Sequence, residues 1–177
     1  MISIDLRYLG WSAFEITIED GRRLLLDPFF SGRPNEGITP SPARLEEFDD
    51  VDFVLVTHIA QDHLGQAFDV LGRSRATLVC DVATCFVALA EGITSERIFH
   101  MVPGVQFAFK HLLVKALPTE HLFLKKLGEN AYINAAPLSY LIATPRGIRV
   151  FFGGTRPSAR TISSLVVSIN LMWLSWG

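Results

Sequence analysis

Cysteine is scarce in this sequence of 177 residues, and its two cysteines, Cys80 and Cys85, exclude two common architectures. Their spacing fits neither a Cys-x-x-Cys metal or redox motif nor a disulfide framework. We expect two reduced, buried thiols, and this state is typical of a protein that works in the cytoplasm.

The chain also lacks an excess of charge of either sign. Its formal net charge is -2, and its 16 lysines and arginines are scattered without a polybasic run. No nucleic acid partner and no membrane contact are therefore expected. The longest apolar stretch, 165–176, is shorter than the roughly 20 residues of a membrane-spanning helix. No basic segment followed by an apolar core opens the chain, so we expect no secretion signal.

What the sequence does contain is the pattern of a globular domain. Hydrophobic residues make up 49% and charged residues 19% of the chain, and we expect residues 1–177 to form a single domain. Residues 2–9 and 13–18 alternate between apolar and polar positions, and the turn Asp20-Gly21 leads into a further strand over 23–26. This spacing predicts an antiparallel meander.

The middle of the chain predicts a layered α/β arrangement. Apolar runs over 53–56 and 76–80 are typical of strands covered on both faces. Helices are expected over 41–48, 66–71 and 82–91, the last capped by Asp81 and ended by Gly92. Beyond them the pattern predicts strands over 97–102, 105–109, 112–117, 139–144 and 148–152, a helix over 158–165 and a final strand over 166–174.

Three metal-ligand side chains, His58, Asp62 and His63, follow directly after the apolar run 53–56. A strand that ends in a loop directs its last side chains into the crevice at the sheet edge, where open α/β sheets bind ligands. Imidazole and carboxylate groups suit zinc, manganese or iron. The alternative is structural, with Asp62 capping the next helix and His63 packing beneath it. Spacing alone favours neither interpretation.

Asp27 and His121 also stand just past expected strands. A buried carboxylate at Asp27 needs a partner, so it is a candidate for orienting a ligand histidine, with a simple turn residue as the alternative. His121 is a candidate ligand, with Glu120 beside it as a carboxylate ligand or base, although a lone histidine is by default an ordinary residue. His100 and His111 are predicted to be structural.

A tight turn of small residues, Gly153-Gly154-Thr155, follows the strand over 148–152, and Arg156 comes next. Glycine lets the backbone approach a ligand closely, and a guanidinium group binds anions. Arg156 is therefore a candidate substrate-binding residue, as is Arg33, and an exposed loop arginine is the alternative.

Five motifs in register resemble those of the metallo-β-lactamase superfamily, in its branch of ascorbate-6-phosphate-lactonase-like and predicted metal-dependent hydrolases. They are Gly10-Trp11-Ser12-Ala13-Phe14, similar to Gly-His-Ser-x-Phe; Asp27-Pro28-Phe29, similar to a strand-end Asp-Pro-Phe; residues 57–65, similar to Thr-His-x-His-x-Asp-His-x-Gly; Pro118-Thr119-Glu120-His121, where the next ligand histidine lies; and Phe152-Gly153-Gly154-Thr155, similar to a Gly-Asp-Thr turn.

The resemblance implies an αββα sandwich, two mixed β-sheets flanked by helices, with a one- or two-metal site at the sheet edge. It implies that His58 and His121 hold a first metal ion and that Asp62 and His63 hold a second. A metal-bound water, its pKa lowered towards about 7, then attacks an ester, lactone or phosphodiester of a small-molecule substrate. Asp62 orients or deprotonates that water. Zinc is the expected metal, with manganese and iron as alternatives.

Three departures from the family pattern predict a depleted site. Ala60 replaces a ligand histidine, Gly154 replaces a bridging aspartate, and the chain ends at Gly177, before the expected last ligand histidine, so the C-terminal part of the fold is expected to be incomplete. Two functions follow: a metal-dependent hydrolase, or a non-catalytic relative that holds no metal and binds a ligand or protein. The apolar strand over 166–174 predicts a homo-oligomer, and a purely structural dimer is a third alternative.

Overall fold

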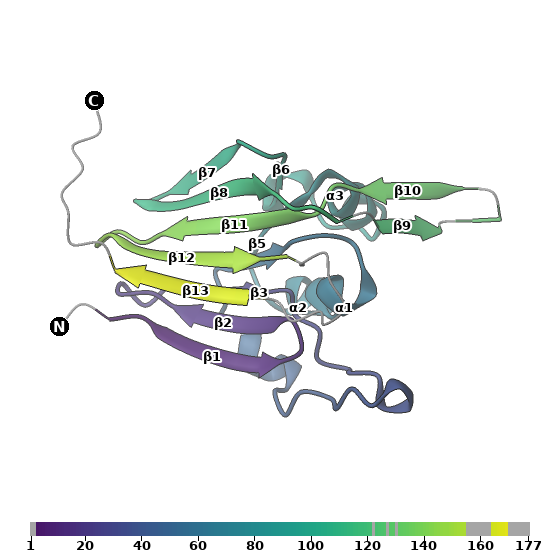
Figure 1. Ribbon diagram of the computed structural model, residues 1–177, viewed down its shortest axis with the longest axis horizontal. Helices are drawn as coiled ribbons and strands as arrows, with labels where there is room; N and C mark the ends of the chain where they lie inside the picture. The colour runs from purple at the N-terminus through teal and green to yellow at the C-terminus, as the bar shows by residue number, and fades with distance from the viewer. Residues whose placement is uncertain (1–2, 122, 127, 130, 155–163, 170–177) are drawn as a thin grey trace.

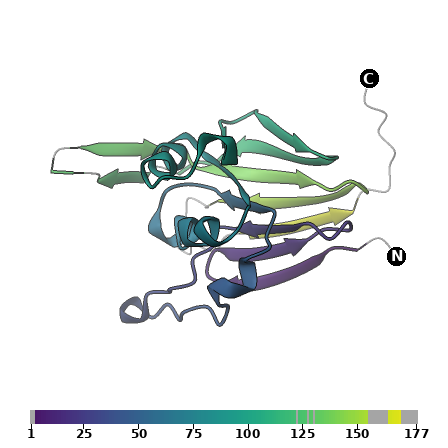
Figure 2. The same ribbon diagram turned by 180° about the vertical axis from the view of Figure 1, so that it is seen from behind.

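The computed structural model describes residues 3–121, 123–126, 128–129, 131–154 and 164–169. Two β-sheets face each other in this part of the chain (Figure 1). The α-helices lie on the outer face of one sheet, which is the side turned towards the viewer in Figure 2. The two-sheet α/β class that the sequence predicts is thus confirmed.

The first sheet has six strands in sequence order: β1 (Asp5–Gly10), β2 (Ala13–Thr17), β3 (Arg23–Leu26), β4 (Phe53–Val56), β5 (Thr77–Asp81) and β6 (Ile98–Met101). Strands β1–β3 form the predicted antiparallel meander, and β3–β6 run parallel. Parallel neighbours end at the same edge of a sheet. The loops after β3, β4 and β5 therefore meet at one edge.

The second sheet has the order β13-β12-β11-β8-β7. Its strands are β7 (Gln106–Phe109), β8 (Leu112–Pro118), β11 (Leu138–Ala143), β12 (Ile148–Gly153) and β13 (Ser164–Ile169). All its pairings are antiparallel, because hairpin turns join β7 to β8 and β11 to β12. The resemblance had implied a mixed sheet here. Between β8 and β11, the strands β9 (Phe123–Lys126) and β10 (Tyr132–Ala135) form a hairpin that extends from one end of the body (Figure 1).

Short helices connect the parallel strands: α1 (Gln61–Leu64), α2 (Ala67–Arg73) and α3 (Val82–Ala90), with 3-10 turns η1 (Pro34–Glu36), η2 (Leu45–Phe48) and η3 (Ser95–Arg97). As predicted, the Asp81 carboxylate caps α3 and accepts hydrogen bonds from the backbone N–H groups of Ala83 and Thr84. Among the described residues, no helix combines the length and the hydropathy needed to cross a membrane.

The parallel strands bury both of their faces, which explains their continuous apolar runs. Val54 and Val56 of β4 point towards the helices and pack in a core with α2 and α3. Phe53 and Leu55 point the other way, into a core shared with the second sheet. The central strand β4 therefore holds its terminal loop between two packed layers.

The helix predicted over 41–48 is present only as η2. Ser41 Oγ accepts a hydrogen bond from the backbone N–H of Ala43, at 3.1 Å, which makes a local turn instead of a helix cap. The sequence patterns did not predict α1, β9 or β10. Of the predicted C-terminal helix and strand, residues 158–163 and 170–174 lie outside the described residues, while Ser164 and Leu165, predicted as helix, belong to β13.

Gly65, at the end of α1, has no room for a side chain. Its φ is +46°, and a Cβ atom there would lie 2.2 Å from Pro28 O. Gly92 also has a positive φ, +85°, but nothing lies within 4 Å of its Cβ position. We expect Gly92→Ala to lower the free energy of unfolding by about 1–2 kcal/mol, the cost of a left-handed non-glycine residue. Gly65→Ala should lower it by at least about 3 kcal/mol because backbone must also move.

Urea denaturation of the two variants and the wild type measures this difference. Equal losses at the two positions would contradict the close approach of Gly65 to the loop after β3.

Candidate metal centre

The candidate site residues come from loops at the carboxyl edge of the first sheet. Asp27 follows β3, and His58 follows β4. His63 and Asp62 lie on α1, which begins directly after the β4 loop. His121 comes from the segment after β8 of the second sheet. The two sheets and their loops thus bring together side chains that are far apart in the sequence.

A buried hydrogen-bond network surrounds Asp27, which is fully buried. Its carboxylate accepts hydrogen bonds from the backbone N–H and the hydroxyl of Thr57, each at 2.7 Å. His63 Nδ1 lies 2.7 Å from Asp27 Oδ2. Three donors therefore converge on one carboxylate, and the Nδ1 proton of His63 is directed at it. This is the contact expected of a carboxylate that orients a ligand histidine.

Burial and pairing act against each other on the pKa values of this pair. Burial raises the pKa of Asp27, and the charge of His63 with the hydrogen bonds only partly offsets it. Burial opposes the charge on His63 too, but attraction to Asp27 and their hydrogen bond outweigh it, so the pKa of His63 is raised. Each residue of this buried pair thus favours the charged form of the other.

His58 is held in one tautomer by the same network. The single Thr57 hydroxyl proton is used by Asp27, so Thr57 Oγ1 accepts a hydrogen bond from Nδ1–H of His58, at 3.1 Å. Burial, followed by the charges of His63 and His121, lowers the pKa of His58 to about 2. The ring is neutral, and its Nε2 lone pair is buried without a hydrogen-bond partner. A neutral imidazole with a free Nε2 is the form that binds a metal.

The three imidazole rings lie close to one another. The ring centroid of His58 is 4.2 Å from that of His63 and 5.2 Å from that of His121. Burial and then the charge of His63 lower the pKa of His121. The Phe123 ring, with its centroid 5.8 Å from that of His58, adds an apolar neighbour. The structure thus gathers three of the four predicted ligands into one cluster, which we call the histidine cluster (His58, His63 and His121).

Asp62, the fourth predicted ligand, is engaged elsewhere. Its Oδ2 accepts a hydrogen bond from Nε1 of Trp11 at 3.2 Å, and its Oδ1 lies 3.6 Å from a guanidinium nitrogen of Arg33. Ser12 Oγ donates to the backbone oxygen of Asp62. Sequence reasoning gave Trp11, Ser12 and Thr57 no role in the site, although all three lie in motifs that carry the family resemblance.

The described side chains fit a metal ion in part. The orphaned Nε2 of His58 and the carboxylate-tied ring of His63 have the chemistry of metal ligands. Within the described residues, however, no three histidine, cysteine, aspartate or glutamate side chains come close enough together to hold an ion. A third donor, His121 or Asp62, has to move to complete a site. The predicted roles of these residues as ligands stay predictions.

The second sheet closes over the β4 loop. Leu138 N donates to Thr57 O at 3.0 Å, and the buried Tyr140 hydroxyl donates to Val56 O at 2.7 Å. A Cβ atom at Gly154 would lie 2.4 Å from Leu138 O and 3.0 Å from Thr57 Cβ. The place where the resemblance implies an aspartate is therefore filled by backbone. Arg156, the predicted substrate-binding residue, lies outside the described residues.

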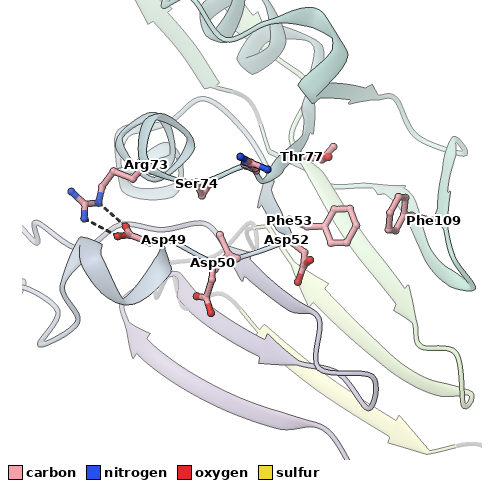
Figure 3. A pocket seen from close by; sticks show the side chains of 10 residues that line it. Asp49, Asp50, Asp52, Phe53, Arg73, Ser74, Thr77 and Phe109 are labelled. Atoms are coloured by element: carbon pink, nitrogen blue, oxygen red, sulfur yellow. Dashed lines mark hydrogen bonds and ion pairs between the residues drawn. The ribbon is translucent and has the colours of Figure 1, made fainter.

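The opposite edge of the first sheet has a hollow of about 490 Å³ beside the amino ends of β4 and β5 (Figure 3). Asp49 pairs with Arg73 through bonds of 2.7 and 3.0 Å, which Figure 3 marks as dashed lines. Asp50 pairs with Arg23, and Asp52 accepts the backbone N–H of Arg23. Asp49 and Asp50 are thus paired with arginines of the protein itself, and the hollow lies away from the histidine cluster.

Comparison with known families places this chain in one class of proteins. A model described as the beta-lactamase superfamily domain matches residues 22–174. The chain therefore belongs to the β-lactamase superfamily, as the five motifs implied.

Relatives with curated sequences include a UPF0173 metal-dependent hydrolase of Caldivirga maquilingensis, 45% identical over 152 residues, which cover 85% of this chain and 59% of the relative. Another, from Methanopyrus kandleri, is 33% identical over 150 residues, covering 84% of this chain and 60% of the relative. The chain thus spans about three fifths of the length of these relatives.

Solved structures share the fold at low sequence identity. Igni18, a metallo hydrolase from Ignicoccus hospitalis, has a TM-score of 0.68 and 20% identity, over 86% of this chain and 61% of that one. An isothiocyanate hydrolase from Delia radicum gut bacteria has a TM-score of 0.59 and 14% identity, over 87% of this chain and 63% of that one.

The depressed pKa of His58 predicts acid sensitivity of the metal-free protein. The folded pKa is about 2, against 6.5 for a free histidine, so below pH 6.5 the unfolded chain binds a proton that the folded chain does not. Stability must then fall as pH falls, by about 2 kcal/mol between pH 7 and pH 5 for this group. His58→Gln should lose that part of the pH dependence. Urea denaturation at pH 7, 6 and 5 with a chelator present measures the free energy of unfolding of both proteins. An identical change of this free energy with pH in the variant and the wild type would contradict the buried, neutral state of His58.

The closed packing at Gly154 predicts that a side chain is not tolerated there. Gly154→Asp and Gly154→Ala should each lower the free energy of unfolding by about 2 kcal/mol or more because Leu138 and Thr57 must move. Gly72→Ala is the matched control, since nothing lies within 4 Å of its Cβ position in α2, and it should raise stability by about 0.5–1 kcal/mol. Wild-type melting of Gly154→Asp would show that the site has room for the aspartate.

Proposed function

We propose that the protein is a metal-dependent hydrolase with a depleted site centred on the histidine cluster. The observation that carries the proposal is the buried Nε2 lone pair of neutral His58, which lies beside His63 and has no hydrogen-bond partner. An unpaired buried nitrogen costs free energy unless a ligand satisfies it. The metal-dependent hydrolases named among the relatives support the same assignment.

In this proposal His58 and His63 are the first two ligands, and His121 or Asp62 supplies the third. Zinc is the first choice of metal because it takes imidazole and carboxylate ligands in groups of three or four, with manganese and iron as alternatives. A bound divalent ion lowers the pKa of a coordinated water and polarises a carbonyl or phosphoryl oxygen. Two preset ligands imply weak binding.

The chain's own residues then supply orientation and proton transfer. Asp27 holds the His63 ring through the bond of 2.7 Å, and Thr57 holds the tautomer of His58. Asp62 orients the attacking water or takes its proton, as the family resemblance implies. The substrate is proposed to be a small molecule with an ester, lactone or phosphodiester bond. A cytoplasmic location, a single domain over 1–177 and a homo-oligomer also stay proposals.

A second candidate function is a ligand- or protein-binding module without catalysis. It is favoured by the lack of three converging ligands among the described residues and by the closed packing at Gly154. Ala60 adds to it, since its methyl group is buried where the resemblance implies a histidine. Metal binding separates the two candidates.

Metal content after mild purification tests the proposal. We expect the wild type to bind zinc, manganese or iron near one equivalent after reconstitution, and His63→Ala to reduce binding at least tenfold because a ligand and the partner of Asp27 are lost. His100→Ala is the matched control, because His100 is exposed on β6 of the same sheet. Elemental analysis and titration calorimetry give both quantities.

Wild-type protein that takes up no metal on reconstitution would overturn the hydrolase and favour the binding module. Equal binding by His63→Ala and the wild type would locate the metal elsewhere in the chain.

A further inference from the structure

The carboxylate of Asp62 is held by two side chains from outside the histidine cluster. Trp11 Nε1–H donates to Oδ2 at 3.2 Å, and Arg33 lies 3.6 Å from Oδ1. Each oxygen of the carboxylate thus has its own cationic or hydrogen-bonding partner. Asp62 is only partly exposed, with 21% of its side-chain surface accessible, so these contacts are less screened than those of a surface pair.

Trp11 makes its contact from a strained backbone. It is the first residue of the two-residue turn between β1 and β2, and its φ is +47°. Glycine or asparagine is usual at such a turn position, and a bulky residue there is a true outlier. Strain of this kind persists where surrounding contacts impose it, and it clusters at functional sites. Here the next residue, Ser12, also binds the backbone oxygen of Asp62, so the turn holds Asp62 at two points.

Arg33 is held in place by contacts with its own loop. Its backbone N–H and carbonyl pair with Ile38 at 2.9 and 3.0 Å, which closes the loop around η1. Its guanidinium carbon lies 5.7 Å from the centroid of the Phe29 ring, and another guanidinium nitrogen lies 3.3 Å from Glu36. These contacts position the guanidinium group of Arg33 independently of Asp62.

We infer that Trp11 and Arg33 form a latch that holds the Asp62 carboxylate out of the metal site and thereby sets how tightly the histidine cluster binds a metal ion. The inference rests on the proposed function. No three described ligand side chains converge, while the carboxylate of Asp62, a predicted ligand, is held by Trp11 and Arg33. Asp62 must leave at least part of this latch to become a third ligand, so the latch competes with the ion.

The test measures zinc affinity of the full chain, freed of metal with a chelator, by competition with a chromophoric chelator. Trp11→Phe keeps an aromatic ring and removes only the N–H, so it should tighten zinc binding about tenfold, the equivalent of one charge-assisted hydrogen bond. Arg33→Gln is the second variant and should tighten binding in the same direction. Arg73→Gln is the matched control: it removes an arginine that pairs with an aspartate at the opposite sheet edge, and it should leave the affinity unchanged.

A double-mutant cycle identifies Asp62 as the group through which the latch acts. In the Asp62→Asn background, Trp11→Phe should change zinc affinity less than twofold, because the carboxylate that it releases is gone. The absorption spectrum of the cobalt-substituted protein gives an independent readout, since an added carboxylate ligand changes the coordination geometry of the ion. Thermal melts confirm that each variant is folded.

Tighter zinc binding by Trp11→Phe and Arg33→Gln that disappears with Asp62→Asn supports the latch. If the wild type binds zinc and both variants bind equally or more weakly, the latch is overturned while the hydrolase proposal stands; weaker binding would make Trp11 a support of a ligating Asp62 instead. If neither the wild type nor any variant binds zinc, cobalt or manganese, the hydrolase proposal and the latch both fail.

Discussion

The burial of the Asp27 carboxylate is the constraint on which the edge of this molecule depends. A fully buried carboxylate is costly unless donors surround it. Asp27 obtains them from Thr57 and His63, and its own backbone N–H is bound to Leu55 O at 2.9 Å. These contacts join the end of β3 to the end of β4 and to α1. The φ of Asp27, +42°, shows that the chain adopts an unfavourable backbone conformation to place it there.

The tautomers of His58 and His63 follow from that one carboxylate. Because the Thr57 hydroxyl donates its hydrogen bond to Asp27, Thr57 can only accept from His58, and the Nε2 of His58 has no hydrogen-bond partner. Asp27 at the same time accepts a hydrogen bond from the Nδ1–H of His63. The buried carboxylate of Asp27 thus orients the imidazole of His63 directly and that of His58 through Thr57. Tyr140 and Leu138 of the second sheet donate hydrogen bonds to the backbone oxygens of Val56 and Thr57. The position of Thr57, and with it the tautomer of His58, therefore depends on how the two sheets pack.

Much of the fold could be predicted because its causes are local in the sequence. The alternation in 13–18 marks β2 as a strand, and the apolar run 53–56 matches β4, whose four residues are all buried. The predicted grouping of Asp27, His58 and His63 followed from the rule that parallel strands end at one edge of a sheet. The family resemblance added His121 to this group as a metal ligand. The contacts of Asp62 with Trp11 and Arg33 were not predictable in this way, because both partners lie in turns whose conformation depends on tertiary contacts. The hairpin β9–β10 was missed for a related reason: a two-stranded hairpin is stable only where it packs on something else, here Phe123 and Ile133 against the main core.

The two replacements in the described site differ in kind, although the sequence presents them alike. Ala60 precedes α1, and its backbone oxygen accepts the N–H groups of His63 and Leu64, so its contribution to the fold is made by backbone. A different side chain at 60 leaves those bonds in place and has only its own volume to accommodate. Position 154 has no room for a side chain, because Leu138 O lies 2.4 Å from where a Cβ atom would stand. A side chain at position 154 therefore requires both Leu138 of β11 and Thr57 of the β4 loop to move. The packing around position 154 thus excludes a side chain there, and among the described residues the candidate ligands of the proposed metal site are the three imidazoles and Asp62.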